Sequence, residues 1–467
     1  MESLARALQT LVSFLPPDLS AHYLLALTGP VLESIGMTAG AMLIAYMVSL
    51  PLGLYVGLRG PGSRFIGFVL SGVRAIPDLT LAILCVIFVG IGPAAGMIAM
   101  AIFYTAAVAK IFGDLFKTAD AAPLDAIRAT GASPVQVALF LIPLKLNDIL
   151  SYGSYEFESA VRASVIVGAV GGGGLGAELV GTLNGFDFQR TTTLLLVLIG
   201  IVAAVDALTV RLRQRPVWLL LLVPPSLYAL WVFQPEQFSL LHAVHTIGAM
   251  FPPSLDSDAI ARLPALIAET CAMALFGTVL GGIIAFPLAL MSARTIAPPW
   301  VALPVRRFLE ALRAVPETVW GLVLVAIAGI GPEAGTIALG LHSAGSLGRL
   351  FAESFENVDP APVLAVAATG ARPVAVVAYA TLPLASAPIG VHTLFRLEWN
   401  LRQATVVGMI GAGGIGQALF EAQQLFFYQA MVAYLLITWV MVLAVDQLSQ
   451  MTRARAGWIT LPAEEIR

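Results

Sequence analysis

Apolar stretches long enough to cross a membrane recur along most of the chain. A helix needs about 20 mainly apolar residues to span the hydrocarbon core, and its backbone polar groups must be paired within it. The pattern therefore predicts an all-α membrane protein with about 11 transmembrane helices. The predicted spans are about 35–58, 75–92, 94–112, 143–169, 191–210, 217–233, 264–291, 314–330, 333–350, 383–409 and 429–448.

The composition agrees with that pattern and removes several classes of function. Only 11% of the residues are charged and 58% are hydrophobic, whereas a soluble domain carries about 25% charged residues. The basic residues form no run that could follow a nucleic-acid backbone, so nucleic acid is excluded as a partner. Cys85 and Cys271 lie inside apolar stretches without neighbouring His or Cys, which predicts neither a disulfide nor a metal site.

Arginine placement predicts the orientation, because short cytoplasmic loops collect basic residues. Arg59, Arg64 and Arg74 lie between the first two predicted spans with no acidic residue among them, whereas 234–262 holds three acidic residues and only one arginine. We therefore expect the N-terminus outside and the C-terminus inside the bacterial cytoplasmic membrane. Residues 1–34 lack the basic start and cleavage site of a signal peptide and are interpreted as an outer-surface segment.

The chain repeats itself. The segment Arg74-Ala-Ile-Pro-Asp78 returns 239 positions later as Arg313-Ala-Val-Pro-Glu317, and Gly90-Ile-Gly-Pro93 returns unchanged at Gly329. Each copy holds five predicted spans, and the additional span at 217–233 makes the two copies parallel, related by an axis along the membrane normal. The predicted divisions are an N-terminal segment 1–34, a first repeat 35–215, a linking helix with an outer loop 216–263, a second repeat 264–452 and a cytoplasmic tail 453–467.

Two Ala-rich segments on the predicted cytoplasmic side, residues 118–134 and 357–373, are unlike ordinary loops; we call them the docking segments. Each begins with an acidic residue and a nearby Pro, which suit a helix N-terminus, and we expect a short helix that stops at Gly131 or Gly370. Small side chains leave a flat surface that another protein's groove can hold. A helix lying on lipid would instead carry Trp, Phe or Leu on one face and cations on the other.

The docking segments resemble the signature of the permease subunits of ABC importers, in which Glu-Ala-Ala and a Gly precede a Leu-Pro pair. Here the signature reads Asp125-Ala-Ile-Arg-Ala-Thr-Gly131 before Leu141-Ile-Pro143, and Leu364-Ala-Val-Ala-Ala-Thr-Gly370 before Thr381-Leu-Pro383. Asp125 and Leu364 stand where the pattern has glutamate. The lines Phe395-Arg-Leu-Glu-Trp-Asn-Leu-Arg402 and Gly408-Met-Ile-Gly-Ala-Gly-Gly-Ile-Gly416 are similar to the branch that imports phosphonate, phosphite and phosphate.

This resemblance implies two type I permease copies of five helices each, fused in one chain. It implies a channel for phosphonate or a related phosphorus oxyanion, with alternating access driven by two copies of a separate ATPase and with an external substrate-binding protein. ATP and Mg would be bound by that ATPase, and no cofactor is expected in this chain. The residues implied to couple to the ATPase are Asp125, Ala126, Ala129, Thr130, Gly131, Ala365, Ala368, Thr369 and Gly370.

Four charged residues fall inside predicted spans, where a charge at the bilayer centre costs about 2.5–3.5 kcal/mol on insertion scales. Glu158 and Arg162, like Glu398 and Arg402, are four residues apart and share a helix face within ion-pair reach. In one interpretation each pair neutralises itself and holds its helix against a neighbour. In the other, the two arginines flank the transport path and attract a dianion, because guanidinium groups match its oxygens.

A Gly-rich stretch closes the fourth predicted span of each repeat. A phosphate-binding loop would need a Gly-Lys pair, which the sequence lacks, so ATP binding to this chain is excluded. Glycine allows sharp bends and close backbone contacts, which favours either a gate or simple packing. The glycines assigned to the path or gate are Gly171, Gly173, Gly174, Gly411, Gly413 and Gly414.

A secondary transporter or channel without an ATPase is the alternative function, because parallel repeats occur in that class as well. Such a protein would have no use for paired Ala-rich cytoplasmic helices. An enzyme is not expected, because the five histidines give no arrangement of nucleophile, base and oxyanion donors.

Overall fold

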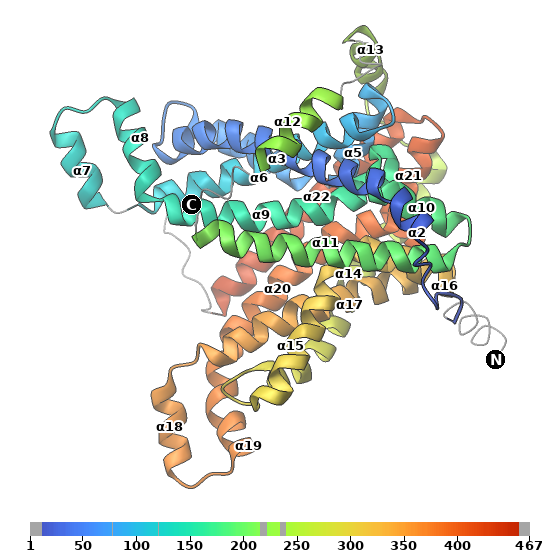
Figure 1. Cartoon of the computed structure of the whole chain (residues 1–467). Coiled ribbons are helices and arrows are strands. Elements are labelled where there is room, and N and C mark those ends of the chain that lie inside the picture. Colours follow the sequence, from blue (N-terminus) through green and yellow to red (C-terminus); the bar gives the residue numbers. More distant parts are fainter. Residues whose placement is uncertain (1–11, 77, 120, 215–221, 234–239, 457–467) are drawn as a thin grey trace. The chain divides into compact units, whose positions relative to one another are not determined.

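The structure is a computed structural model that describes residues 12–76, 78–119, 121–214, 222–233 and 240–456. Across these residues the regular structure is helical, with no strand, so the predicted all-α fold is confirmed. The chain divides into two compact units (Figure 1). The first unit is Ser13–Gly248, and the second unit is Ala249–Arg467 together with Met1–Val12.

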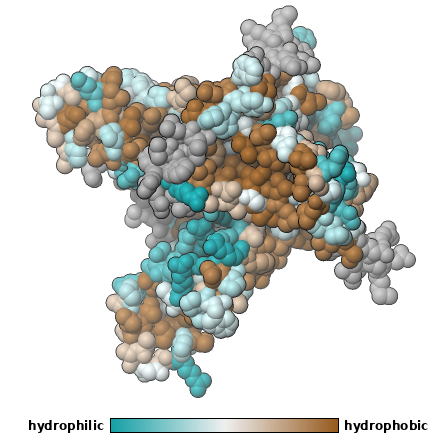
Figure 2. Space-filling view, in the orientation of Figure 1, coloured by the Kyte–Doolittle hydropathy of each residue, from teal (hydrophilic) through white to brown (hydrophobic). Residues whose placement is uncertain are grey.

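The first unit consists of long helices joined by short ones. Its helices are α2 (Ala21–Ala26), α3 (Thr28–Gly57), α4 (Ser63–Ala75), α5 (Asp78–Val89), α6 (Pro93–Lys117), α7 (Ala121–Ala129), α8 (Pro134–Leu144), α9 (Leu146–Val167), the π-turn η1 (Gly168–Gly172), α10 (Gly174–Asn184), α11 (Phe188–Gln214) and α12 (Val223–Val232). Hydrophobic side chains cover the middle of α11 in Figure 2, which suits a helix that faces lipid.

The second unit repeats this order, except that one helix, α14, covers the positions of both α2 and α3, and that no described helix corresponds to α12. Its helices are α14 (Ser257–Ser292), α15 (Pro299–Ala314), α16 (Glu317–Ala328), α17 (Pro332–Glu356), α18 (Pro360–Ala368), α19 (Pro373–Val376), the π-turn η3 (Val377–Thr381), α20 (Leu382–Val407), the π-turn η4 (Gly408–Ala412), α21 (Gly414–Gln424) and α22 (Tyr428–Arg455). The remaining helix, α13 (Leu240–Met250), lies at the division between the units.

The described residues contain fewer membrane spans than the eleven predicted. Six helices are long and apolar enough to cross a membrane, and counting each bent helix pair as one span gives nine. α17 is absent from both groups because it is more polar, and most of its central residues are buried inside its unit rather than facing lipid. The predicted span 217–233 lies partly outside the described residues, and its described part, α12, has ten residues, about half a span.

The first long helix begins earlier than predicted. We expected a span from about residue 35, but α3 starts at Thr28, so Glu33 and Ser34 belong to this helix rather than to the outer-surface segment 1–34. The loop predicted after that span is also partly helical, because α4 occupies Ser63–Ala75. Both differences place charged residues on ordered helices.

In each unit a short amphipathic helix meets the next helix nearly at a right angle. α15 and α16 are inclined by 82°, and the corresponding segments Ser63–Arg74 and Leu79–Val89 by 90°. The sequence explains the bend, because Ile76 and Val315 each precede a proline, which disfavours the helical conformation. Both residues are extended, with ψ of 128° and 119°.

In each unit the first two long helices, α3 with α6 and α14 with α17, pack closely where one helix carries a glycine. A Cβ built on Gly281 of α14 would lie 2.5 Å from the Cβ of Ser343 on α17. A Cβ built on Gly57 of α3 would likewise lie 2.5 Å from the Cβ of Phe116 on α6. Small residues let membrane helices approach and gain packing contacts where lipid offers no hydrophobic driving force. These two helix pairs form the scaffold on which the polar residues are placed.

Candidate functional site

Both docking segments form the short helices that the sequence predicts. α7 and α18 stop at Gly131 and Gly370, which share a left-handed conformation with φ of +79°. The amide of each glycine donates to a carbonyl three residues earlier at 3.0 Å, which closes the last turn. Asp359 caps α18 by accepting from the Ala361 amide at 3.0 Å, whereas the corresponding Asp120 lies outside the described residues.

The docking helices present their small residues outward. α18 has no buried residue, and α7 is held to its unit through the buried Leu124. A Cβ built on Gly131 or Gly370 would meet nothing within 4 Å. The residues predicted for docking are all exposed: Asp125, Ala126, Ala129, Thr130, Gly131, Ala365, Ala368, Thr369 and Gly370.

The first predicted charge pair forms as expected. Arg162 donates to Glu158 at 2.5 Å along α9, and the side chains are 15% and 5% exposed. A buried charge is tolerated when it is paired and hydrogen-bonded. The pair therefore lets α9 carry an arginine inside the unit.

The second predicted pair is wrong. The ion pair of Glu398 is with Arg453 from α22, at 2.7 Å, and not with Arg402 four residues along α20. Arg453 is almost fully buried, also donates to Ser449 at 2.9 Å and lies over the Phe395 ring at 3.9 Å. Because the partner comes from another helix, this pair joins α20 to α22 instead of neutralising one face of α20.

The Gly-rich stretches break a long helix and start a short one. Gly171 and Gly411 have φ of +108° and +107°, and the glycines at 173, 174, 413 and 414 are also left-handed. The Gly171 carbonyl accepts from the Gly92 amide at 2.8 Å, and Gly411 accepts from Gly331 at 3.1 Å. Each stretch thus binds the turn that precedes α6 or α17, so the predicted sharp bend is observed, with close packing around it.

Sequence reasoning missed the side chains that hold these bends. Glu33 accepts from the Gly174 amide and Ser34 from the Leu175 amide, both at 2.9 Å. In the second unit Glu269 accepts from Gly414 at 2.9 Å and Thr270 from Ile415 at 3.0 Å (Glu269 and Thr270 lie on α14). A carboxylate at a helix N-terminus satisfies unpaired amides and complements the helix dipole. The available signal was an acidic residue followed by a hydroxyl residue at the same place in both repeats.

A buried hydrogen-bond network crosses the second unit. The Asn400 amide donates to Thr278 and to Ser343, each at 2.9 Å, and the Arg396 Nε also donates to Ser343 at 2.9 Å. These residues come from α14, α17 and α20. Thr278, Ser343 and Asn400 are buried, so their mutual hydrogen bonds offset the cost of removing them from water.

A second buried cluster lies at the start of α16. Glu317 accepts from the Trp399 indole at 3.1 Å and lies 3.4 Å from His342 Nε2, while His342 Nδ1 is 2.9 Å from the Val315 carbonyl. Because a carbonyl oxygen only accepts, Nδ1 carries a proton. The cluster therefore joins the start of α16 to α17 and α20 through the contacts of one buried carboxylate.

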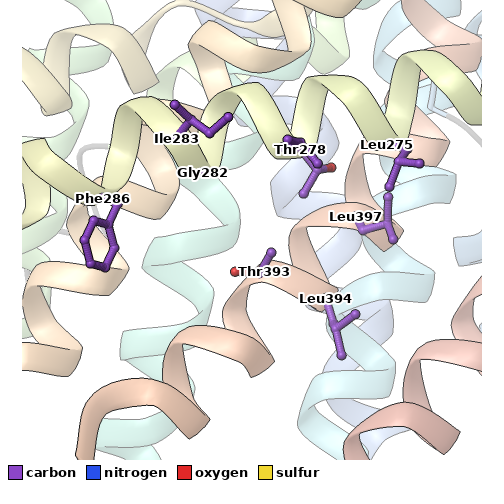
Figure 3. A pocket seen from close by; sticks show the side chains of 9 residues that line it. Leu275, Thr278, Gly282, Ile283, Phe286, Thr393, Leu394 and Leu397 are labelled. Carbon is purple, nitrogen blue, oxygen red and sulfur yellow. The ribbon is translucent and has the colours of Figure 1, made fainter. Parts of the chain in front are cut away.

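An apolar groove of about 580 Å³ runs between α14 and α20 (Figure 3). Its two threonines do not make it polar, because Thr278 and Thr393 donate back to carbonyls of their own helices at 2.7 and 2.8 Å. Such a lining offers nothing to an oxyanion. The lining residues are Leu275, Thr278, Val279, Gly282, Ile283, Phe286, Thr393, Leu394 and Leu397.

Comparison with known proteins identifies the scaffold. The family model of the binding-protein-dependent transport system inner membrane component matches residues 49–217 and again 285–456, which confirms the predicted duplication. The phosphate-import permease protein PhnE of Mycolicibacterium smegmatis is 30% identical over 417 residues, covering 83% of this chain and 77% of that protein. The putative phosphite transport system permease protein HtxC of Stutzerimonas stutzeri is 40% identical over 222 residues, covering 46% and 78%.

Among solved structures, an inward-facing form of the MetNI methionine ABC transporter is similar to this chain. The match covers 43% of this chain and 99% of that chain, with 19% sequence identity and a TM-score of 0.41.

Proposed function

We propose, from the premise that this chain belongs to the family of inner-membrane components of binding-protein-dependent transport systems, that it is the complete channel of an ATP-driven importer for a phosphorus oxyanion. The family match occurs in both halves of the chain, and a permease normally contributes one such half. The substrate class rests on the relatives named for phosphate and phosphite import. The substrate is phosphonate, phosphite or phosphate.

The observation that carries this proposal is the pair of docking helices. α7 and α18 come from equivalent places in the two units, stop at glycines with the same φ, and expose the same small residues. Two surfaces with the same small residues match two copies of one ATP-binding subunit, a homodimer. That subunit binds ATP and Mg, and its movement drives alternating access; this chain needs no cofactor and hydrolyses nothing itself.

The remaining partners follow from the same arrangement. An external binding protein delivers the oxyanion to the outer ends of the units. The N-terminus lies outside and the C-terminus inside, because Arg59, Arg64 and Arg74 lie together after the first span. In this orientation both docking helices face the cytoplasm, where ATP is available.

The transport path passes along α9 and α20. Arg162 and Arg402 lower the barrier for a dianion, while Glu158 keeps Arg162 in place through the 2.5 Å ion pair. The glycine bends that end these helices, at Gly171 to Gly174 and Gly411 to Gly414, form the outer gate. The apolar groove between α14 and α20 is not part of the path, because it has no donor for an oxyanion.

The double variant Gly131→Asp with Gly370→Asp tests the coupling role. Both sites have open space and a left-handed backbone, which aspartate adopts more readily than most residues, so the main change is one negative charge on each docking surface. We expect uptake to fall at least about tenfold, since one unpaired charge in an interface costs on the order of 1.4 kcal/mol or more, while the chain still inserts. The measurement is ATP-dependent uptake of labelled substrate by cells.

Gly62→Asp is the matched control. Gly62 has φ of +75° and also has nothing within 4 Å of a built Cβ, but it precedes α4 instead of ending a docking helix. We expect normal uptake from this variant. Normal uptake from the double variant, at equal membrane abundance, would refute the role of α7 and α18.

A further inference from the structure

Two helices that the transport function leaves unexplained are α4 and α15. Each is strongly amphipathic, follows the first long helix of its unit and lies at 90° or 82° to the helix after it. The following helices, α5 and α16, have 12 residues each and reach only part of the way across the bilayer. Where such a helix runs along the membrane normal, a helix at a right angle to it lies along the membrane plane. The exposed side chains of α4 and α15 therefore determine which part of the membrane these helices contact.

The second-unit helix α15 has a buried side and an exposed side. One side, with Ala302 and Leu309, is buried against α17, where Gly348 leaves room for the Leu309 side chain. A second side carries Trp300 and Phe308, which are 77% and 53% exposed. Arg307 lies seven residues after Trp300 and therefore on the same exposed side, whereas Arg306 turns toward the unit, where it pairs with Glu356 and donates to the Ser292 carbonyl.

The first-unit helix α4 also has a buried side and an exposed aromatic side, although its sequence differs. Leu70 is buried, and Phe65 and Phe68 are 70% and 68% exposed on the neighbouring side. Arg64 and Arg74, both exposed, lie near opposite ends of α4, and α4 contains no acidic residue. The recurrence of this division in both units argues that it serves a purpose at this place in the fold.

We propose that α4 and α15 lie in the interface of one bilayer leaflet and bind anionic phospholipids. The exposed aromatic rings enter the acyl-chain boundary, and the exposed arginines reach the phosphate groups. Arg307 is suited to this role because it is largely exposed and its partner, Glu310, is a neighbour on the same exposed helix, a pair that contributes little. This proposal is independent of the substrate and of the ATPase.

The docking helices serve as an internal contrast. α7 and α18 are also short and exposed, but most of their outward residues are Ala, with Asp125 and Arg128 on α7 and Leu364 on α18, and they have no exposed aromatic side chain. Exposed aromatic side chains assign α4 and α15 to lipid, and the absence of such side chains from α7 and α18 assigns those helices to a protein surface.

The depth of the aromatic side is tested with nitroxide labels on the full chain in phosphatidylglycerol–phosphatidylcholine nanodiscs. Phe65→Cys, Phe308→Cys and Leu364→Cys are labelled separately in a chain that carries Cys85→Ala and Cys271→Ala. Labels at 65 and 308 are expected to relax with oxygen more than with a water-soluble nickel reagent, whereas the label at 364 on α18 shows the reverse. Equal water access at all three sites would overturn the proposal.

The headgroup preference is tested by native mass spectrometry of the full chain extracted from vesicles with equal amounts of the two lipids. Phosphatidylglycerol should be retained over phosphatidylcholine, and Arg64→Gln or Arg307→Gln should each weaken that retention about fivefold at its site. The control is Arg128→Gln, an exposed arginine on α7, which should leave retention unchanged. Equal retention of the two lipids, or the same loss from the control, would overturn the assignment.

Discussion

The buried centres of the two units are filled by different kinds of side chain. Where the second unit has Thr278, Ser343 and Asn400, the positions 236, 239 and 240 residues earlier hold Met42, Tyr104 and Ala160. All six residues are buried. The second unit combines two small residues with a large amide, whereas the first combines two large residues with alanine.

This difference shows what the repeated scaffold requires. A membrane-protein interior needs its volume filled and its polar groups paired. In the second unit Asn400 donates both amide hydrogens to neighbours at 2.9 Å, while in the first unit the same region is filled mainly by apolar atoms. The two units are therefore alike at the positions that fix the backbone conformation. They differ at buried positions where either polar or apolar side chains can fill the volume and leave no polar group unpaired.

The largest effect is expected from removing the amide in the second unit. Asn400→Ala leaves a cavity and deprives Thr278 and Ser343 of a donor, which should cost about 2–4 kcal/mol. The measurement is the thermal unfolding midpoint of the full chain in detergent. Ala160→Asn should also destabilise, because the amide meets Met42 and Tyr104 instead of two hydroxyl acceptors. An unchanged midpoint for Asn400→Ala would show that the network contributes nothing.

A smaller and equal effect is expected from the repeated helix caps. Glu33→Gln and Glu269→Gln each weaken a charge-assisted hydrogen bond to a helix N-terminus, at Gly174 and Gly414, and should cost about 1 kcal/mol. Because the two bonds have the same length, 2.9 Å, the unfolding midpoints should fall by similar amounts. A lower unfolding midpoint for only one of the two variants would mean that the glutamate caps do not contribute equally to the stability of the two units.

The smallest effect is expected from filling the groove of the second unit. Gly282 lines that groove, and the position 236 residues earlier holds Tyr46, whose hydroxyl donates to the Gly153 carbonyl at 2.5 Å. Gly282→Tyr has open space around its Cβ and gains helix propensity, so it should stabilise by about 0.5 kcal/mol. Tyr46→Phe, the counterpart, should destabilise by about 1 kcal/mol. A clear loss from Gly282→Tyr would contradict the open groove.

The sequence was sufficient for the features that are local or duplicated. Apolar length gave the helices, the spacing of Arg74 and Arg313 gave the repeat, and the docking helices end at the predicted Gly131 and Gly370. The Glu158–Arg162 pair was also predictable, because both side chains lie on one helix face. These features depend on contacts within a few residues or on comparison of two copies.

The features that were missed depend on contacts between distant segments. Glu398 was assigned to Arg402 by helical spacing, but α22 brings Arg453, 55 residues away, to the same carboxylate. Glu33 meets Gly174 across 141 residues, and no periodicity within either segment indicates this contact. Tertiary packing decides which of several partners a buried charge receives, and a single sequence does not show that packing.

Uptake of labelled phosphonate, phosphite and phosphate by vesicles that contain the purified chain tests the coupling role of α7 and α18. We expect no uptake by the chain alone, with or without an ion gradient. We expect ATP-dependent accumulation when the ATP-binding subunit and the external binding protein are added. Accumulation by the chain alone would contradict the central claim that α7 and α18 transmit work from a separate ATPase.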